Sequence, residues 1–170
     1  METEQVQAGG AVYGCEKLGR LTTAMLHRPG DELELINEAN YRDWLFDRVP
    51  DVAGYQREHD RYRELLEARG VEVLELCDYV RVNRGLTGRL PNLTFLHDIA
   101  VISSKGAILS SMAWKGRKNE QIVVREALEN IGVPVLVEFD EQADAFEGCL
   151  LLSDDTVLVA ETERHSNGSV

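Results

Sequence analysis

Two acidic residues stand where they could hold a cation together. Asp98 directly precedes one predicted β-hairpin, and Glu147 precedes another predicted hairpin 49 positions later. If the equivalent strand ends converge on one axis, the two carboxylates face the same centre and repel each other unless a cation lies between them. A guanidinium group suits such a pair because it is planar, has five N–H donors and binds carboxylates bidentately. The spacing leaves open the alternative that both residues are surface acids beside hairpins.

Helix and strand patterns predict the elements that would position these acids. Apolar residues recur at helical spacing in residues 55–69 and 120–131, and a glycine ends each of these segments. Runs rich in valine and leucine follow at residues 71–76 and 133–139, which is typical of β-strands. An earlier strand is predicted over residues 21–26. Each predicted helix therefore leads straight into a strand.

Two predicted hairpins complete an internal repeat. They occupy residues 99–111, with a turn at Lys105-Gly106, and residues 149–160, with a turn at Asp154-Asp155. Residues 78–91 are predicted to form a loop. The order strand, turn, strand, helix, strand occurs about twice, and the hairpin of a third unit follows. We therefore expect an α/β fold of ββαβ units that pack side by side around a common axis.

The composition narrows the classes of partner and location. A formal net charge of −12 disfavours nucleic acid and anionic membranes, which are bound through basic patches. No run of 18 apolar residues occurs, so no transmembrane helix is expected. The three cysteines are widely separated, which favours a reducing, cytoplasmic environment over a disulfide framework. Residues 1–13 are predicted to be a flexible lead-in to a domain over residues 14–170.

Five segments, in order along the chain, resemble motifs of the arginine deiminases. Residues 26–34 (LHRPGDELE) resemble "HRPG-x-E-L", and residues 90–98 (LPNLTFLHD) resemble "PN-x-x-F-x-R-D". Residues 112–120 (MAWKGRKNE) are similar to "M-x-x-x-x-R-x-x-E". Residues 146–149 (FEGC) and 163–166 (ERHS) resemble "EGGD" and "SERT". Each match is short, but together they identify the chain as similar to the N-terminal half of the arginine deiminase and amidinotransferase superfamily.

This resemblance implies a fold, a chemistry and a set of site residues. The family fold is the pentein, a five-bladed α/β-propeller of ββαβ units, of which this chain would form about two and a half blades. In the family, a cysteine thiolate attacks the guanidinium carbon, an imidazole shuttles the proton, and two carboxylates hold the guanidino nitrogens. By resemblance, the carboxylates are Asp98 and Glu147, the arginines that bind the substrate α-carboxylate are Arg117 and Arg164, and the pocket-lining residues are Asn92 and Phe95.

The sequence also departs from the family pattern. His97 replaces the arginine of "R-D", and Leu150 replaces the final acid of "EGGD". These changes leave the guanidino substrate open, and they leave open both deimination and amidino transfer. The catalytic histidine and cysteine belong to the family's C-terminal half, so this chain would be a subunit or a fragment of an enzyme whose other half supplies them. We expect a complementary C-terminal-half chain, in a hetero-oligomer, or a homo-oligomer to cover the open strand edges. The alternatives are a non-catalytic pentein half that binds or regulates, and a structural protein that associates through open strand edges.

Other residues that could do chemistry are assigned structural roles. Cys149 lies two residues from Glu147, whose charge would raise the pKa of the thiol and lower its reactivity. His97, on an extended chain, would point away from Asp98. His59 is expected to cap or solvate its helix. The remaining structural assignments are His27 to a turn, and Cys15 and Cys77 to the core. No cysteine or histidine spacing is typical of a zinc site, so neither a metal nor a cofactor is expected.

Overall fold

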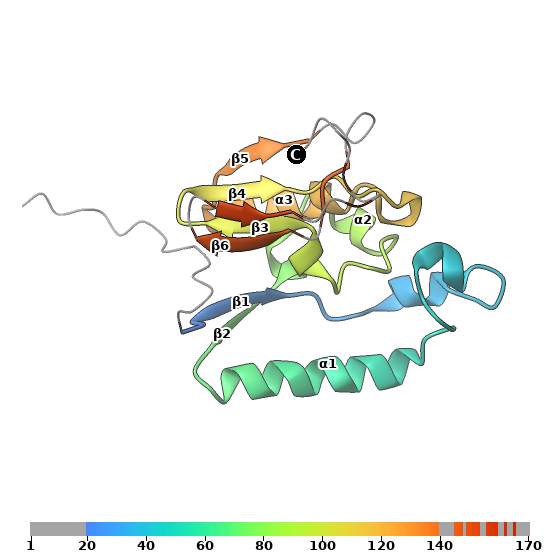
Figure 1. Cartoon of the computed structure of the whole chain (residues 1–170). Coiled ribbons are helices and arrows are strands. Elements are labelled where there is room, and N and C mark those ends of the chain that lie inside the picture. Colours follow the sequence, from blue (N-terminus) through green and yellow to red (C-terminus); the bar gives the residue numbers. More distant parts are fainter. Residues whose placement is uncertain are drawn as a thin grey trace, which may run out of the picture.

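The computed structural model describes residues 20–139, 145–147, 149–153, 156–159, 162 and 165. Its strands are β1 (Thr23–Leu26), β2 (Glu72–Glu75), β3 (Ala100–Ser103), β4 (Gly106–Leu109), β5 (Val135–Glu138), β6 (Leu150–Ser153) and β7 (Thr156–Leu158). Its helices are α1 (Val52–Glu67), α2 (Arg84–Thr87) and α3 (Glu120–Ile131). Short 3-10 turns are η1 (Asp31–Leu35), η2 (Tyr41–Trp44), η3 (Leu76–Tyr79), η4 (Leu96–Asp98) and η5 (Lys115–Arg117). Figure 1 shows a unit of β1, β2 and α1 beside a larger body that holds β3 to β6 and α3.

The unit of β1, α1 and β2 is a parallel strand pair joined through a helix. Leu26 at the end of β1 lies opposite Glu75 at the end of β2. Helix α1 starts where Asp51 accepts a hydrogen bond from the Gly54 amide at 3.0 Å, so it begins three residues before the predicted start. The prediction that His59 solvates this helix is wrong, because its side chain is buried.

The unit of β3, β4, α3 and β5 has the predicted order of elements. Strands β3 and β4 form the antiparallel hairpin, and β5 returns from α3 to pair with β4 in parallel. Strands β6 and β7 form the next antiparallel hairpin, whose turn at 154–155 lies outside the described residues. The order strand, turn, strand, helix, strand is therefore present in the structure, and the fold is α/β.

One turn of this unit requires glycine. Gly106, at the tight turn between β3 and β4, has φ +143°, a backbone conformation that side chains other than glycine rarely adopt. A Cβ at this position would overlap the carbonyl oxygen of Pro134, which accepts a hydrogen bond from the Ala107 amide at 2.9 Å. The hairpin turn and the entry to β5 can approach this closely only because residue 106 has no side chain.

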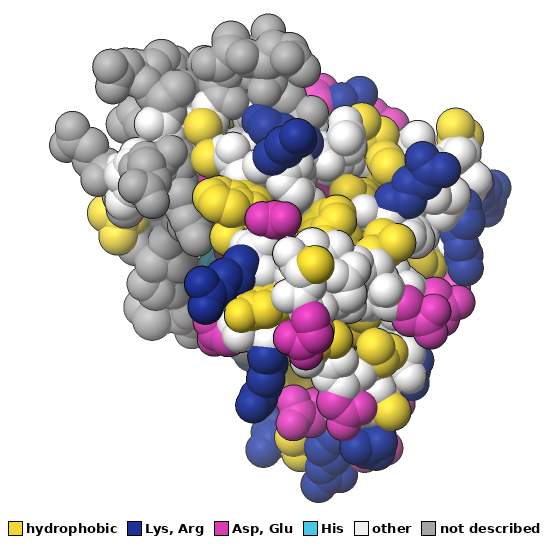
Figure 2. All heavy atoms as spheres, turned by 90° about the vertical axis from the view of Figure 1, so that its right-hand side faces the viewer, with side chains coloured by type: hydrophobic (Ala, Val, Ile, Leu, Met, Phe, Trp, Pro, Cys, Tyr) yellow, Lys and Arg dark blue, Asp and Glu magenta, His cyan; other side chains and the backbone are white. Residues whose placement is uncertain are grey.

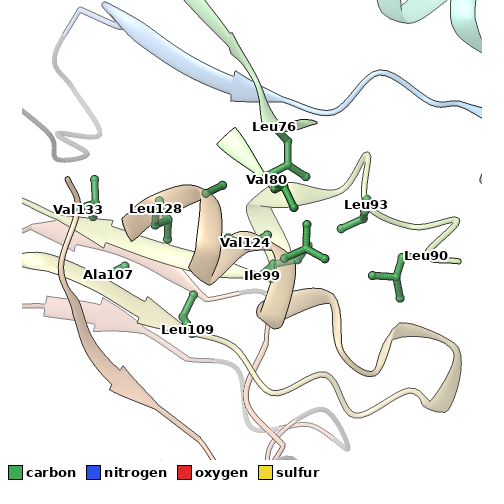
Figure 3. Close-up of a cluster of buried hydrophobic side chains, with 12 residues drawn as sticks. Leu76, Val80, Leu90, Leu93, Ile99, Ala107, Leu109, Val124, Leu128 and Val133 are labelled. Atoms are coloured by element: carbon green, nitrogen blue, oxygen red, sulfur yellow. The ribbon is translucent and has the colours of Figure 1, made fainter. Parts of the chain in front are cut away.

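The main core lies between α3 and the elements that surround it (Figure 3). Val124 and Leu128 of α3 face Ala107 and Leu109 of β4, while Leu76 enters from η3. The other labelled side chains of this cluster are Val80, Leu90, Leu93, Ile99 and Val133. Burial of this apolar face, at about 25 cal/mol per Å² of apolar surface, is what holds α3 on the sheet.

The segment predicted as a loop, residues 78–91, contains short helical structure, because η3 ends in it and α2 lies within it. A carboxylate on α3 fixes its backbone. The side chain of Glu126 accepts hydrogen bonds from the amides of Arg81, Val82 and Asn83 at 2.5, 2.7 and 2.8 Å. Partial burial acts to raise the pKa of Glu126, but these backbone donors outweigh burial and lower that pKa to about 2.

The surface is mixed in charge and polarity on the side that Figure 2 presents. Hydrophobic and uncharged side chains occupy the middle of this face, and both acidic and basic side chains surround them. The net charge of −12 is therefore not expressed as a single acidic surface on this side. Among the described residues, no helix is long and apolar enough to cross a membrane.

Candidate functional site

The candidate site centres on Arg117, a buried arginine at the end of η5 that bridges two carboxylates. Its side chain is 5% exposed. Its Nη1 donates to Oδ2 of Asp98 at 2.7 Å. Its Nε lies 3.1 and 3.0 Å from the two carboxylate oxygens of Glu120, and Nη2 lies 2.8 Å from Oε2. This fork of charge-assisted hydrogen bonds fixes the guanidinium and both acids in one arrangement.

Local chain geometry brings these three side chains together. Asp98 ends η4, two residues before β3 begins, and Arg117 ends η5, between β4 and α3. Because β3 and β4 form a hairpin, the chain that enters it and the chain that leaves it lie side by side. Glu120 is the first residue of α3, three positions after Arg117, and the positive end of the helix dipole favours an acid there.

Glu147 enters the same region from the segment that leads into the β6–β7 hairpin. Phe146 and Ser111 exchange backbone hydrogen bonds of 2.9 and 2.8 Å, so this segment lies beside the end of the β3–β4 hairpin. Glu147 is buried. Its charge acts on Glu120, as that of Asp98 does.

Burial and the neighbouring charges together set the pKa of Glu120. Complete burial of its carboxyl raises the pKa, the Arg117 guanidinium opposes that rise, and the charges of Asp98 and Glu147 add to it. The net effect raises the pKa of Glu120 to about 7.

Phe95 and Asn92 flank the acids in different ways. The guanidinium carbon of Arg117 lies 5.9 Å from the centre of the Phe95 ring, and the Phe95 side chain is exposed. Asn92 is buried, and its Nδ2 donates to the carbonyl oxygen of Trp44 at 3.0 Å. Trp114 makes a similar contact to the same turn, because its Nε1 donates to the carbonyl oxygen of Asp43 at 2.7 Å. Asn92 thus ties its segment to η2, while Phe95 presents a ring to solvent.

The structure corrects one expectation about this segment. His97 was expected on an extended chain, pointing away from Asp98. Residues 96–98 instead form η4, because the amides of Asp98 and Ile99 bond back to the carbonyls of Phe95 and Leu96 at 3.1 and 3.0 Å. The His97 residue is exposed.

Cys149 lies beside a histidine, His165. Its Sγ lies 3.5 Å from Nε2 of His165 and 3.6 Å from the carbonyl oxygen of Glu147. The His165 ring meets Phe146 edge-on, with centroids 5.7 Å apart. Burial raises the pKa of the Cys149 thiol, and the Glu147 charge raises it further, as the sequence predicts. The thiol is therefore held in its unreactive, protonated form near neutral pH.

No protein-family model matches the chain. The arginine deiminase of Rhodococcus opacus (strain B4) is 43% identical over 82 residues, which are 48% of this chain and 20% of the relative. That of Mycobacterium avium (strain 104) is 52% identical over 62 residues, 36% of this chain and 15% of the relative.

Solved structures match a larger share of this chain than the sequence relatives do. A dimethylarginine dimethylaminohydrolase, as an adduct with 4-chloro-2-hydroxymethylpyridine, aligns with a TM-score of 0.63 at 18% identity. A mutant of that enzyme from Pseudomonas aeruginosa, complexed with citrulline, aligns with a TM-score of 0.65 at 15% identity. Both alignments cover 88% of this chain and 53% of the other.

The chain has an arginine deiminase-like pentein fold.

The chain spans about half the length of these pentein structures (53%) and a smaller part of the curated relatives (20%). Of the residues that the pentein resemblance singles out, Asp98, Arg117 and Phe95 lie in contact around one guanidinium. Glu147 acts on the same group, and Asn92 lies on the segment that leads into it. Arg164 lies outside the described residues.

Glu120 is a residue of this candidate site that the sequence analysis did not single out. A signal for it was present, because Arg117 and Glu120 are three positions apart at a predicted helix start, where opposite charges on a helix pair. The matching segment, residues 112–120, also ends on this glutamate. The burial of Glu120 could not be predicted from the sequence, because a glutamate at a helix start is ordinarily solvated.

Proposed function

We propose that this chain holds the guanidinium group of a small substrate in a guanidine-modifying hydrolase or amidinotransferase. Asp98 and Glu147 are the carboxylates that accept hydrogen bonds from the substrate's guanidino nitrogens. The observation that carries this proposal is the pair of Asp98 and Arg117. Arg117 fixes one oxygen of Asp98 at 2.7 Å, yet 29% of the Asp98 side chain stays exposed to a ligand.

The charge balance supports a cationic ligand. Arg117 is the one cation in contact with Asp98 and Glu120 among the described residues, and Glu147 adds a further acid nearby. A second guanidinium would relieve repulsion among these carboxylates and would form the same bidentate bonds that Arg117 already forms.

The role that we propose for Arg117 differs from the one that the resemblance implies. Its Nε and both Nη nitrogens already donate to Glu120, Asp98 and the carbonyl of Phe95. We therefore assign Arg117 to orienting Asp98. Binding of a substrate carboxylate then falls to Arg164, which matches the other arginine of the family pattern. Phe95, whose ring is exposed, would cover the bound guanidinium.

The bond-breaking groups are proposed to belong to a C-terminal half outside this sequence, whether on the same polypeptide or on a complementary chain. A thiolate there would attack the guanidinium carbon and form a C–S bond. An imidazolium would then protonate the departing nitrogen as its C–N bond breaks. Water, or an acceptor amine in amidino transfer, would release the amidino group. The raised pKa of Cys149 supports assigning the nucleophile to that C-terminal half.

Calorimetry with arginine, agmatine and guanidine tests this function on the complete assembly. We expect Asp98→Asn and Glu147→Gln each to weaken guanidine binding at least about tenfold, because each loses a charge-assisted hydrogen bond. Asp60→Asn is the matched control, since Asp60 is a partly exposed acid on α1 that pairs with Arg28 at 2.6 Å. Binding that is absent in the complete assembly, or that both variants leave unchanged, contradicts the proposal. Binding without release of an amine supports the regulatory alternative.

A further inference from the structure

Three groups that bind metals meet where β1 and β2 end. His27 follows β1, Glu75 is the last residue of β2, and Cys77 lies two residues further in η3. Nδ1 of His27 lies 3.6 Å from Oε1 of Glu75 and 3.7 Å from Sγ of Cys77. All three ligand atoms lie within 4.8 Å of one another. Parallel pairing brings them together, because Leu26 and Glu75 are partners in the register of the two strands.

The two separations from Nδ1 of His27 match edges of a zinc tetrahedron. Zinc binds imidazole nitrogen and carboxylate oxygen at about 2.0–2.2 Å and thiolate sulfur at about 2.3 Å, which puts tetrahedral ligand atoms about 3.3–3.7 Å apart. Both distances from Nδ1 of His27 fall at this spacing. The ligand set of one imidazole, one carboxylate and one thiolate also favours zinc over magnesium or calcium, which prefer oxygen alone.

The groups behind these ligands hold them in orientation. Oε1 of Glu32 lies 3.2 Å from Nε2 of His27, and the same oxygen accepts the amide of Gly30 at 2.6 Å. Because an ionised carboxylate only accepts, Nε2 donates to Glu32, and the other ring nitrogen faces Glu75 and Cys77. Metal-binding histidines are oriented by carboxylates in the same way. Oε1 of Glu75 is in turn oriented by the amide of Arg28 at 3.0 Å.

Burial and charge make the cluster suitable for a divalent cation. His27 and Glu32 are buried, and Glu75 and Cys77 are partly buried. Among the described residues, Oε2 of Glu75 is buried and receives no hydrogen bond. A thiolate and a carboxylate together carry the two negative charges that neutralise one divalent ion. A metal ion bound here would give a partner to the polar atoms of His27, Glu75 and Cys77, which the pairing of β1 with β2 brings together.

We propose that His27, Glu75 and Cys77 bind one zinc ion that joins the ends of β1 and β2. Water completes the tetrahedron, and Glu32 positions the imidazole. The ion ties together a sheet that has only two strands in the described chain, where a metal that binds the folded state alone stabilises it. This proposal does not depend on guanidine binding, and it departs from the sequence-based expectation of no metal.

Zinc titration of the full chain, stripped of metal and competed with a chromophoric chelator, tests the site. We expect one zinc per chain, and at least tenfold weaker binding in Cys77→Ser and in Glu75→Gln. Cys149→Ser is the matched control, because it also removes a free thiol and leaves this cluster intact. Cobalt(II) should give a thiolate charge-transfer absorption in the wild type and in Cys149→Ser, and none in Cys77→Ser. Glu32→Gln should weaken binding about 10–100-fold while the absorption persists.

Several outcomes overturn the proposal. The first is a folded wild-type protein that gives no thiolate–cobalt absorption, a result that needs no comparison with a variant. Equal loss of zinc in Cys77→Ser and Cys149→Ser also overturns it, because the metal would then bind thiols without selection. A third such outcome is a wild-type melting temperature that zinc does not raise, while circular dichroism shows a folded chain. Each outcome would leave a hydrogen-bonded cluster around His27.

Discussion

Arg117 donates to Asp98 at 2.7 Å, so a buried guanidinium already occupies one side of the carboxylate proposed to bind another. The guanidinium also contacts Glu120 through Nε and Nη2. The planar fork of arginine sets the direction of both acids, which a point charge cannot do.

Replacing Arg117 by lysine tests this relationship. Arg117→Lys keeps the charge but removes the bidentate geometry, so we expect guanidine affinity of the assembly to fall at least about tenfold and stability to fall by about 1–3 kcal/mol. Calorimetry and urea unfolding measure the two effects. Unchanged affinity in a folded Arg117→Lys protein would show that Asp98 needs no such orientation.

Glu120 should make stability depend on pH. Burial raises the pKa of this carboxyl from 4.5 to about 7 in the folded state. The folded protein therefore binds more protons between those values, so this contribution is complete below pH 4.5 and is lost as pH rises to about 7. Urea unfolding across this range should show a decline in the wild type that Glu120→Gln lacks. Glu129→Gln, an exposed acid on the same helix, should keep the decline.

The same carboxyl predicts proton release when a guanidinium binds. A second cation beside Asp98 and Glu147 lowers the pKa of Glu120 from about 7, so binding near neutral pH should release a fraction of a proton. Calorimetry in buffers of different ionisation enthalpy measures that fraction. Glu120→Gln should abolish it, and release that persists in this variant would assign the proton to another group.

Glu126 should contribute stability with the opposite pH dependence. Its pKa is lowered from 4.5 to about 2, so its contribution is present above pH 4.5 and is lost as pH falls toward 2. Glu126→Gln keeps one acceptor but loses the charge, so we expect a loss of about 1 kcal/mol at pH 7. Denaturant unfolding at pH 7 and pH 3 checks the sign, and a variant as stable as the wild type at pH 7 would refute the role of these backbone donors.

Gly106 should tolerate no side chain. Gly106→Ala places a Cβ against the Pro134 carbonyl at φ +143°, so we expect destabilisation of more than about 2 kcal/mol. Gly85→Ala is the control, since a Cβ there meets nothing within 4 Å and alanine favours the short helix α2. Thermal unfolding of both variants separates a steric effect from the general cost of changing a glycine.

The sequence by itself determined the elements whose signals are local. The hairpin that turns at Lys105-Gly106 and the helix over 120–131 were both predicted and are both present, because turn residues and apolar spacing act over a few positions. Motif resemblance also singled out Asp98 and Arg117, which lie 2.7 Å apart in the structure. The start of α1 was missed, since the Asp51 cap lies before the apolar stripe that indicated the helix.

Tertiary structure alone decided which groups meet across long separations and how deeply they are buried. The chain carries no motif that joins His27 to Cys77, and parallel pairing of β1 with β2 puts them 3.7 Å apart. The burial of Glu120, and with it a pKa near 7, likewise depends on what packs over the start of α3. Strand pairing and burial join residues that are distant in sequence, so their consequences appear only when the chain is folded.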